Sequence, residues 1–493
     1  MNKETIKRNK ATKITVYDAI CGTGKSCAAI TNIKDSTDRV VIITPLEDEM
    51  NRYVRECPRL TQPVKKYKGG GKTCSSRDLI EQGLSFVTSH ELAKRWKQAD
   101  YKAIKEKGYR LIMDENIETM SQYNPCSEMA SDLKELQECS LSSRLKTKFA
   151  KQLMRNMTPK DINAFVKEYC DVDEQTGLLD LKVKEDENGN PVEVKSELYS
   201  TEIELVKEHK LAYDNGCLIE IMPPEFLKAF TEVKILTYMF KDSPLNSYMD
   251  IYGFRWSRGY ITDEMTFTDT YALRHRNTEV DYESLVTIWD ETINKNMVKF
   301  NVPDDLPNEK KYYYKLSSSA FKEKMTTDEL KQLFKNMHNW CRNYVHLNPA
   351  QMYFTAYNCA VDTNSKRCFY TTPSLRRKYE KRHLACNAKA TNNYADCVGV
   401  AYLINRFSDV TVYSYCCHKG HPYSRDVFAT SEMLQVIFRS ALRKGEPINI
   451  YIPSSRMRKL LRTWLKEQTK ILQENLKSVE YDENGVRILQ PYS

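Results

Sequence analysis

The chain of 493 residues is longer than one hydrophobic core usually needs, so two or three domains are expected. Its composition, with 41% hydrophobic and 29% charged residues, is ordinary for a soluble protein, and no apolar run is long enough to span a bilayer. The net charge of +9 favours a polyanionic partner, and the polar first ten residues do not resemble a secretion signal. These features predict a cytoplasmic protein with no membrane partner.

The first strongly patterned element is a strand, Ile14–Ala19, followed by a glycine-rich loop. The loop reads Asp-Ala-Ile-Cys-Gly-Thr-Gly-Lys-Ser over residues 18–26 and leads into Cys27–Ile30, which suit the first turns of a helix. Gly22 and Gly24 let the backbone turn its N–H groups toward a triphosphate, beside the positive end of the helix dipole. The segment therefore predicts a nucleoside triphosphate site of the phosphate-loop type.

The side chains of this loop have distinct expected roles. Lys25 would reach the β- and γ-phosphates, and the Ser26 hydroxyl would ligate Mg²⁺. Ala19 stands where such loops usually begin with glycine, and a small residue still permits the turn. The alternative is a chance Gly-Lys-Ser turn at the start of a helix. The residues expected to contact the nucleotide are Cys21, Gly22, Thr23, Gly24, Lys25, Ser26 and Cys27.

Three further predicted strands alternate with helical stretches, which is typical of a parallel sheet covered by helices. They are Arg39–Thr44, Leu84–Thr88 and Arg110–Asp114. At the carboxyl end of the last strand, Asp114 can hold Mg²⁺, while Glu115 can orient and deprotonate an attacking water. This pair favours hydrolysis over transfer to a bound acceptor. The alternative is a strand that simply ends in acidic residues.

Residues 121–230 interrupt the alternation of strands and helices. They form a long, charged and mostly helical stretch, with a hairpin expected at Asn188-Gly189. The sheet resumes at Val233–Phe240. We therefore expect a first domain of residues 1–120 and 231–255, with residues 121–230 inserted into it.

A second set of strands follows a linker of accessory helices at residues 256–345. The strand-like runs are Gln351–Ala356, Asp409–Ser414 and Ile448–Pro453. They alternate with helices expected near residues 393–407, 430–444 and 454–473. A hairpin at Val479–Leu489 closes the chain. The pattern predicts a second parallel-sheet domain at residues 346–475 and a C-terminal hairpin at 476–493.

Gln435, Arg439 and Arg443 recur every four residues in the predicted helix before the last strand. This spacing places them on one helix face. Such a face could project guanidinium groups across a cleft onto the γ-phosphate and stabilise charge in the transition state. The alternative is a basic helix face in water.

Motif by motif, the sequence resembles the superfamily 2 helicases of the DEAD/DEAH type. Asp18–Ser26 resembles their first motif and Asp114–Ile117 their second, while Gln435–Arg443 resembles the sixth. The segments similar to the remaining motifs are Ile43–Leu46, Val87–His90, Leu236–Met239, Tyr353–Ala356 and Asn387–Tyr394. The sixth motif departs from the usual form, since Phe438 replaces a glycine and Arg443 falls one residue late.

The resemblance implies an α/β fold with two RecA-like parallel-sheet domains in tandem and a mostly helical insertion in the first. It implies ATP and Mg²⁺ bound in the cleft between the domains. The implied catalytic residues are Lys25, Glu115, Gln435, Arg439 and Arg443, with Ser26 and Asp114 as metal ligands. The residues expected to contact nucleic acid are Thr44, Ser89, Thr355, Thr391 and Asn392, through hydroxyl and amide contacts to phosphates.

The resulting hypothesis is an ATP-dependent helicase or translocase acting on nucleic acid, with DNA favoured over RNA. The resemblance is to the divergent helicases of bacteriophages and mobile elements, which implies replication or recombination proteins as partners and a bacterial or phage-infected cytoplasm. One alternative is a DNA translocase of the restriction or defence type that separates no strands, and another is an RNA helicase. A third is a non-enzymatic nucleic-acid clamp with a degenerate nucleotide site.

Overall fold

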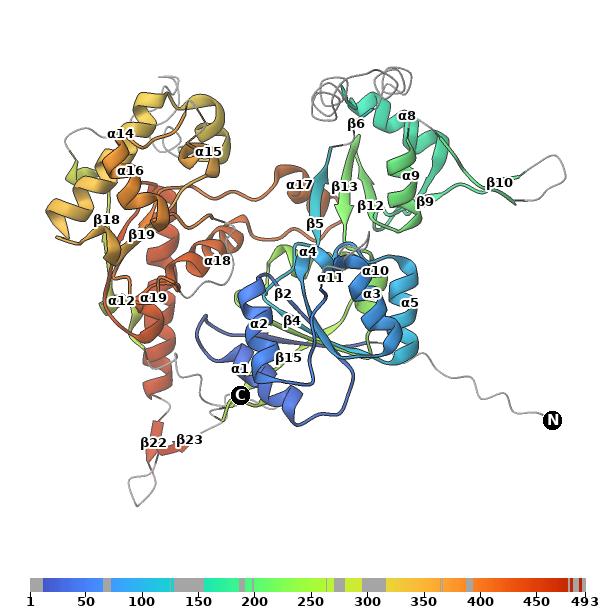
Figure 1. The fold of residues 1–493 in the computed structure, drawn as a ribbon, viewed down its shortest axis with the longest axis horizontal. Coiled ribbons are helices and arrows are strands. Elements are labelled where there is room, and N and C mark those ends of the chain that lie inside the picture. The colour runs from blue at the N-terminus through green and yellow to red at the C-terminus, as the bar shows by residue number, and fades with distance from the viewer. Residues whose placement is uncertain are drawn as a thin grey trace.

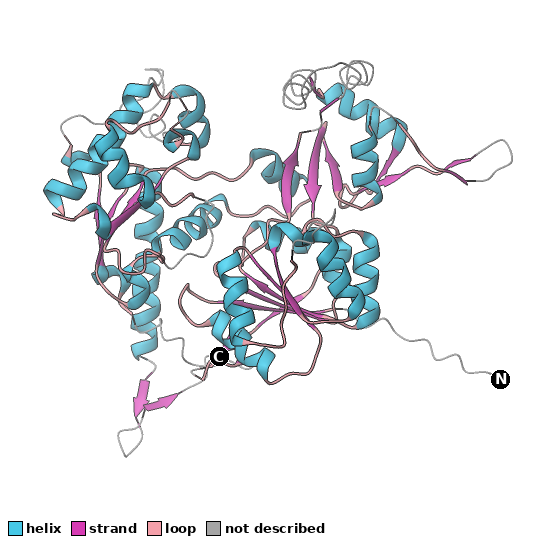
Figure 2. Ribbon diagram, viewed as in Figure 1, coloured by secondary structure: helices cyan, strands magenta, loops and turns pink. Residues whose placement is uncertain are grey.

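The computed structural model describes residues 12–64, 72–124, 126–127, 155–185, 191–196, 199–262, 264–269, 280–294, 316–363, 365, 367–386, 393–477, 479–481 and 487–489. They form two α/β domains and a smaller subdomain inserted in the first, as Figure 1 shows in chain colours and Figure 2 by secondary structure. Among these residues, no helix is long and apolar enough to cross a membrane.

The first domain contains a parallel sheet in the order β15-β1-β14-β4-β2-β3. Its strands are β1 (Lys13–Asp18), β2 (Val40–Thr44), β3 (Phe86–Ser89), β4 (Arg110–Asp114), β14 (Glu232–Thr237) and β15 (Trp256–Arg258). The central strands are rich in β-branched residues and buried on both faces, as a helix-covered parallel sheet requires. Because all these strands run the same way, the segments after β1, β4 and β14 leave the sheet at one edge.

Helices cover both faces of this sheet, and successive strand residues contribute to two separate apolar cores. Val41 and Ile43 belong to one core, while Ile42 between them belongs to the other. The helices are α1 (Lys25–Lys34), α2 (Glu47–Glu56), α3 (Lys72–Gln82), α4 (His90–Ala93), α5 (Gln98–Lys107), α10 (Pro224–Lys228) and α11 (Pro244–Ile251). The short strands β16 (Tyr260–Ile261) and β17 (Phe267–Thr268) form a hairpin beside β1.

The inserted subdomain is more mixed than the mostly helical segment expected from the sequence. Its described residues include an antiparallel sheet in the order β12-β13-β5, with an apolar core of its own around Phe165 and Leu211. The elements are β5 (Met120–Tyr123), β6 (Cys126–Ser127), β7 (Arg155–Asn156), α8 (Pro159–Tyr169), β8 (Cys170–Val172), β9 (Leu179–Leu181), β10 (Lys184–Glu185), β11 (Pro191–Val192), α9 (Ser200–Lys207), β12 (Leu211–Asp214) and β13 (Cys217–Ile221). Strands β10 and β11 pair as a hairpin, whereas β9 pairs with β8 instead; Asn188-Gly189 lies outside the described residues.

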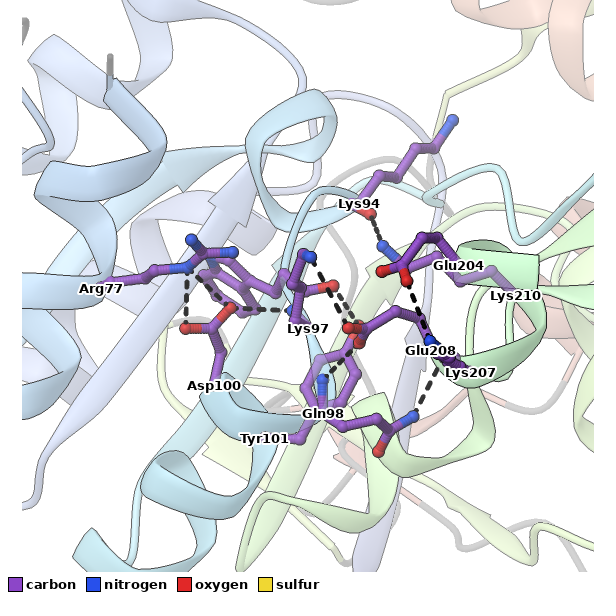
Figure 3. Close-up of polar contacts among 11 residues, drawn as sticks. Arg77, Lys94, Lys97, Gln98, Asp100, Tyr101, Glu204, Lys207, Glu208 and Lys210 are labelled. Atoms are coloured by element: carbon purple, nitrogen blue, oxygen red, sulfur yellow. Dashed lines mark hydrogen bonds and ion pairs between the residues drawn. The ribbon is translucent and has the colours of Figure 1, made fainter. Parts of the chain in front are cut away.

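Polar contacts join the insertion to the helices of the first domain (Figure 3). The backbone N–H of Gln98, at the start of α5, donates to Glu208 Oε2 at 2.7 Å, and the side-chain amide of Gln98 donates to the Glu208 carbonyl. Lys210 Nζ donates to the Lys94 carbonyl at 2.8 Å. These bonds tie the end of α9 to α5, so the insertion is fixed to its parent domain through main-chain groups as well as side chains.

The second domain contains a parallel sheet in the order β18-β21-β20-β19. The strands are β18 (Val286–Trp289), β19 (Met352–Thr355), β20 (Gly399–Tyr402) and β21 (Ile448–Tyr451). Its α-helices are α12 (Tyr282–Leu285), α14 (Thr327–Asn339), α15 (Asn358–Val361), α16 (Pro373–Tyr379), α18 (Arg425–Ile437) and α19 (Ser455–Lys477). Short 3₁₀ and π turns are η2 (Glu291–Ile293), η3 (Ala320–Lys324), η4 (Trp340–Tyr344), η5 (Pro349–Gln351), η6 (Glu380–Arg382) and η7 (Ala441–Lys444). Strands β22 (Val479–Tyr481) and β23 (Arg487–Leu489) pair antiparallel, in agreement with the expected C-terminal hairpin.

The fold class expected from the sequence, two tandem α/β domains with parallel sheets, is confirmed. Three predictions are wrong. The range 256–345, expected to be a linker of accessory helices, contains β15, which pairs with β1 in the first sheet, and β18, which pairs with β21 in the second, so the second domain begins well before residue 346. The run Asp409–Ser414 is no strand but the start of helix α17 (Val410–His418), because the Asp409 carboxylate accepts the N–H groups of Thr411 and Val412 and caps a helix. The region expected to be helical near residues 393–407 instead contains the buried strand β20.

Helix α17 leaves the second domain and packs against the first domain and its insertion, beside β5 and β13 (Figure 1). Tyr415 and Cys416 are fully buried in a core to which Val412 and Tyr423 also contribute, and whose other buried residues come from the first domain and the insertion. The Tyr415 hydroxyl lies 2.5 Å from the Thr176 carbonyl, and His418 Nδ1 lies 2.8 Å from Asp214 Oδ2. The second half of the chain is therefore anchored in the first.

We expect Tyr415→Ala to release this anchor. The substitution removes a fully buried aromatic side chain, which costs about 3 kcal/mol or more in packed cores. Hydrogen exchange of α17 and β5 should accelerate in the variant. Val410→Ala on the same helix is the control, because Val410 is 64% exposed. Equal exchange in the two variants would contradict the anchoring role.

Candidate functional site

The glycine-rich loop lies at the carboxyl end of β1, where the chain turns into α1. Gly22 and Gly24 adopt left-handed backbone angles, with φ of 92° and 89°. Gly24 also has a close neighbour, since a Cβ there would lie 2.2 Å from Met265 Sδ in the β16–β17 hairpin. Both glycines are thus required by the geometry of the turn. The first turn of α1 contains no acidic residue, so no carboxylate of that turn would repel an anionic ligand bound at its N–H groups.

Lys25, the first residue of α1, folds its side chain back over the loop. Its ammonium group donates to the carbonyls of Ala19 and Ile20, the latter at 3.0 Å, and burial lowers its pKa. The Thr23 hydroxyl donates to the Ile20 carbonyl at 2.9 Å and so braces the turn. Cys27 is exposed, with Arg52 Nη2 at 3.1 Å from its sulfur.

The acidic pair follows β4, separated from β1 by the single strand β14. Ser26 Oγ donates to Asp114 Oδ2 at 2.9 Å, so the loop and the acidic strand end meet directly. Burial, together with the adjacent Glu115 carboxylate, raises the pKa of Asp114 to about 6. Hydroxyl and carboxylate oxygens are the ligands that Mg²⁺ prefers, so Ser26 and Asp114 fit that ion.

Glu115 occupies a left-handed conformation with φ of 67°, and its N–H donates to the Leu236 carbonyl of β14 at 2.9 Å. The strained backbone is thus held by a neighbouring strand. Arg439 of the second domain contacts this carboxylate, with Nη2 at 3.3 Å from Glu115 Oε1. Residues far apart in the sequence therefore meet across the two domains.

The prediction that Gln435, Arg439 and Arg443 lie on one face of a single helix is wrong. Helix α18 ends at Ile437, and Arg439 and Arg443 lie in the following turn and in η7. Ser440 causes the break, because its hydroxyl donates to the Ile437 carbonyl and accepts from the Leu442 N–H.

All three side chains nevertheless line the same cavity of about 270 Å³ between the two domains. The sequence-predicted residues that line it with them are Cys21, Gly22, Gly24, Lys25, Ser26, Cys27, Thr44, Asp114 and Glu115.

A second, larger cavity of about 950 Å³ lies next to this one. Pro45, Asn116 and Gln435 line both cavities, so the two are adjacent. Its walls come from both domains and carry hydroxyl, cationic, acidic and aromatic side chains, the acidic ones being Glu91, Glu118, Glu323, Asp409 and Glu432. Examples of the others are Ser317, Ser319, Lys94, Lys322, Arg406, Arg425, Phe407 and Tyr423.

Of the residues expected to contact nucleic acid, the three that the structure describes, Thr44, Ser89 and Thr355, lie near this larger cavity and not in its lining. Thr44 and Thr355 are fully buried at strand ends, with no hydrogen-bond partner for either hydroxyl among the described residues. The Ser89 hydroxyl instead caps α4 by accepting the Leu92 N–H. Their near neighbours Pro45, His90 and Tyr357 do line the cavity. Thr391 and Asn392 lie outside the described residues.

Some residues of the site were not found from the sequence. Tyr53, Arg52 and Met265 reach the loop or the acidic pair from α2 and from the β16–β17 hairpin. Nothing in their local sequence indicates this, since each contact depends on how helices and strands pack.

Comparison with known proteins finds a matching family model, a similar prophage protein and a solved structure that aligns weakly. Residues 281–465, which contain all four strands of the second sheet, match the family described as the YonV C-terminal Rossmann-like domain. The chain is 27% identical over 475 residues to the SPbeta prophage-derived uncharacterized protein YonV of Bacillus subtilis (strain 168), covering 92% of this chain and 99% of the relative. The solved structure of S. tokodaii Xpd4 aligns at 10% identity and a TM-score of 0.38, covering 92% of this chain and 94% of that chain.

The buried carboxyl group of Asp114 should make the metal-free protein pH-dependent. Its pKa in the folded state lies above the usual 3.8, so the folded state binds the proton more tightly than the unfolded state does. Stability should therefore fall as the pH rises from about 4 to about 6, by on the order of 3 kcal/mol.

Asp114→Asn should remove this loss, because its amide oxygen still accepts hydrogen bonds from Ser26 and Tyr53 without carrying charge. The measurement is the difference in Tm between wild type and variant from pH 4 to pH 7 in EDTA. Asp171→Asn, at an exposed position in β8, is the control. A difference in Tm that does not change with pH would contradict the prediction.

Proposed function

We propose that this protein hydrolyses ATP between its two α/β domains and uses the energy to move along or unwind nucleic acid. The observation that carries the proposal is the contact between Arg439 of the second domain and Glu115 of the first. It completes a cavity that also contains Lys25, Ser26 and Asp114. A phosphate loop, an acidic pair and an arginine from another domain are the parts that phosphoryl transfer to water needs.

Each residue has a stated role in this reaction. The loop N–H groups and Lys25 bind the triphosphate, and Ser26 and Asp114 hold the Mg²⁺ that polarises its phosphate oxygens. Glu115 orients the attacking water and accepts its proton. Arg439 stabilises the charge that develops on the γ-phosphate, with Gln435 and Arg443 beside it on the same wall. The arginine arrives from the second domain, so hydrolysis depends on how the domains sit together.

The larger cavity supports a nucleic-acid strand as the second ligand. It is lined by both domains and shares residues with the smaller cavity, so a strand bound there would contact the walls of the ATP site. The lysine, arginine and hydroxyl side chains of its lining suit phosphates. The net charge of +9 is consistent with a polyanionic partner.

The prophage relative supports the proposed biological setting. A homologue from a prophage favours phage or mobile-element replication or recombination in a bacterial cytoplasm, with DNA as substrate and proteins of those pathways as partners. The superfamily 2 resemblance of the motifs agrees with this setting.

Loss of either central side chain should abolish turnover. Lys25→Ala removes the cation that meets the phosphates, and Glu115→Gln removes the base, which should lower nucleic-acid-stimulated ATP hydrolysis by about 100-fold or more. Lys34→Ala, in the exposed last turn of α1, is the matched control. Phosphate release is the readout, with circular dichroism to check the fold. Unchanged turnover in either active-site variant would contradict the proposed ATP hydrolysis at this site.

The interdomain arginine gives a separate test. Arg439→Ala should lower kcat by about 1,000-fold while nucleotide affinity changes little, because a guanidinium of this kind acts on the transition state. Lys444→Ala, at an exposed cation five residues further along, should keep wild-type activity. If the alanine variant at position 439 turns over ATP normally, the second domain does not complete the site.

Two assays distinguish the alternatives. Parallel ATPase titrations with single-stranded DNA, duplex DNA and RNA identify the substrate class. A fluorescent forked duplex then separates unwinding from translocation, since turnover without strand separation favours the restriction-type motor. Nucleic-acid binding with no turnover under any condition favours the clamp.

A further inference from the structure

Tyr53 reaches the acidic pair from helix α2, which the sequence motifs do not include. Its side chain is fully buried, and its hydroxyl donates to Asp114 Oδ2 at 2.8 Å. Ser26 Oγ donates to the same oxygen at 2.9 Å. A carboxylate oxygen has two lone pairs, so these donors together fix the orientation of the Asp114 side chain.

Two other fully buried tyrosines, Tyr248 and Tyr353, use their hydroxyls differently, whereas Tyr451 also donates to a carboxylate, that of Glu291. Tyr248 donates to the Met222 carbonyl at 2.7 Å, and Tyr353 donates to the Val436 carbonyl at 2.6 Å. Those bonds satisfy main-chain groups and connect elements of the core. The Tyr53 hydroxyl instead donates a hydrogen bond to the carboxylate of Asp114, which lines the cavity between the domains.

The ring of Tyr53 is rigidly held. It packs in the apolar core with Met50 of its own helix, Ala28 of α1 and Ile42 of β2. A packed ring has no freedom to move its hydroxyl, so the donor is held in place before any ligand binds. The adjacent Arg52 contacts Cys27 on α1, which gives α2 a second contact with the loop region.

We propose that Tyr53 is a positioning residue that holds the Asp114 carboxylate beside Ser26 in the orientation needed to bind the Mg²⁺ of a nucleotide. The proposal rests on the proposed function for the identity of the ion and the nucleotide. Residues that hydrogen-bond a metal-ligating carboxylate typically change metal affinity by 10-fold or more when removed. The hydroxyl touches neither nucleotide nor water in this role and acts only through Asp114.

Tyr53→Phe tests the role, because it keeps the ring in the core and removes only the hydroxyl. A fluorescent ADP analogue is titrated into the full-length protein with Mg²⁺ and, separately, with EDTA. We expect affinity in Mg²⁺ to fall about 10-fold and affinity in EDTA to stay at the wild-type value. Tyr248→Phe is the matched control, since it also removes a buried tyrosine hydroxyl from the first domain, and should leave both affinities unchanged.

A double-substitution cycle separates positioning from general destabilisation. In an Asp114→Ala background, Tyr53→Phe should have no further effect on the Mg²⁺-dependent affinity, because the group through which it acts is gone. Additive losses would overturn the proposal, as would equal losses in Mg²⁺ and EDTA. Should Tyr53→Phe fail to fold, Tyr53→Leu takes its place in the same cycle, as a smaller apolar residue without a donor.

Titration of the wild-type protein distinguishes failure of the proposed nucleotide site from failure of the role of Tyr53. If the wild-type protein binds the ADP analogue equally in Mg²⁺ and EDTA, or not at all, the proposed metal-nucleotide site fails and the role of Tyr53 fails with it. If it shows clear Mg²⁺ dependence that Tyr53→Phe retains in full, only the role of Tyr53 is overturned.

Discussion

The packing of α17 into the core of the first domain is the constraint on which the candidate site depends. The helix is joined to β20 by residues 403–409 and to α18 by residues 419–424, and α18 leads directly to Arg439. Because Tyr415 and Cys416 are buried in the core of the first domain, the start of α18 is held close to that domain. The Ser424 N–H, just before α18, donates to the Asp242 carbonyl at 2.9 Å. The side of the cavity that carries Arg439 is therefore positioned by contacts far from Arg439 itself.

The loop after β14 is the other element that touches both halves of the site. Its Phe240 N–H donates to Asp18 Oδ2 at 3.0 Å, beside the phosphate loop, while Trp464 Nε1 of α19 donates to the Tyr238 hydroxyl at 2.7 Å. Met239 and Asp242 hold left-handed conformations, with φ of 57° and 59°. This strained segment therefore connects β1 of the first domain to α19 of the second through hydrogen bonds on both sides.

The sequence predicted those parts of the fold and site that are encoded by neighbouring residues. The loop at Gly22–Ser26 and the strand ending at Asp114 have local patterns, and both are where the pattern placed them. Arg439 was correctly expected to face the first domain, although helix α18 ends two residues before it. Its place in the chain after α18 brings it to the cavity even without a continuous helix. Helix α17 was mistaken for a strand because its β-branched and aromatic residues suit either element, and packing against the first domain decides between them. Tyr53 could not be found in this way, because only the packing of α2 brings its hydroxyl to Asp114.

The two cavities are adjacent, so ligands bound in them as proposed would share part of their surroundings. Pro45, Asn116 and Gln435 line both, and they come from the ends of β2 and β4 and from α18. Helix α2 begins immediately after Pro45 and Leu46 and carries Tyr53 to the carboxylate of Asp114. A ligand that displaces the start of α2 would shift Tyr53 with it, because a short helix packed in a dense core moves as a unit. The same displacement would change the orientation of Asp114 without any contact between the two ligands. Coupling of this kind would require no long pathway, since the helix that begins just after Leu46 of the larger cavity also supports, through Tyr53, the Asp114 side chain that lines the smaller one.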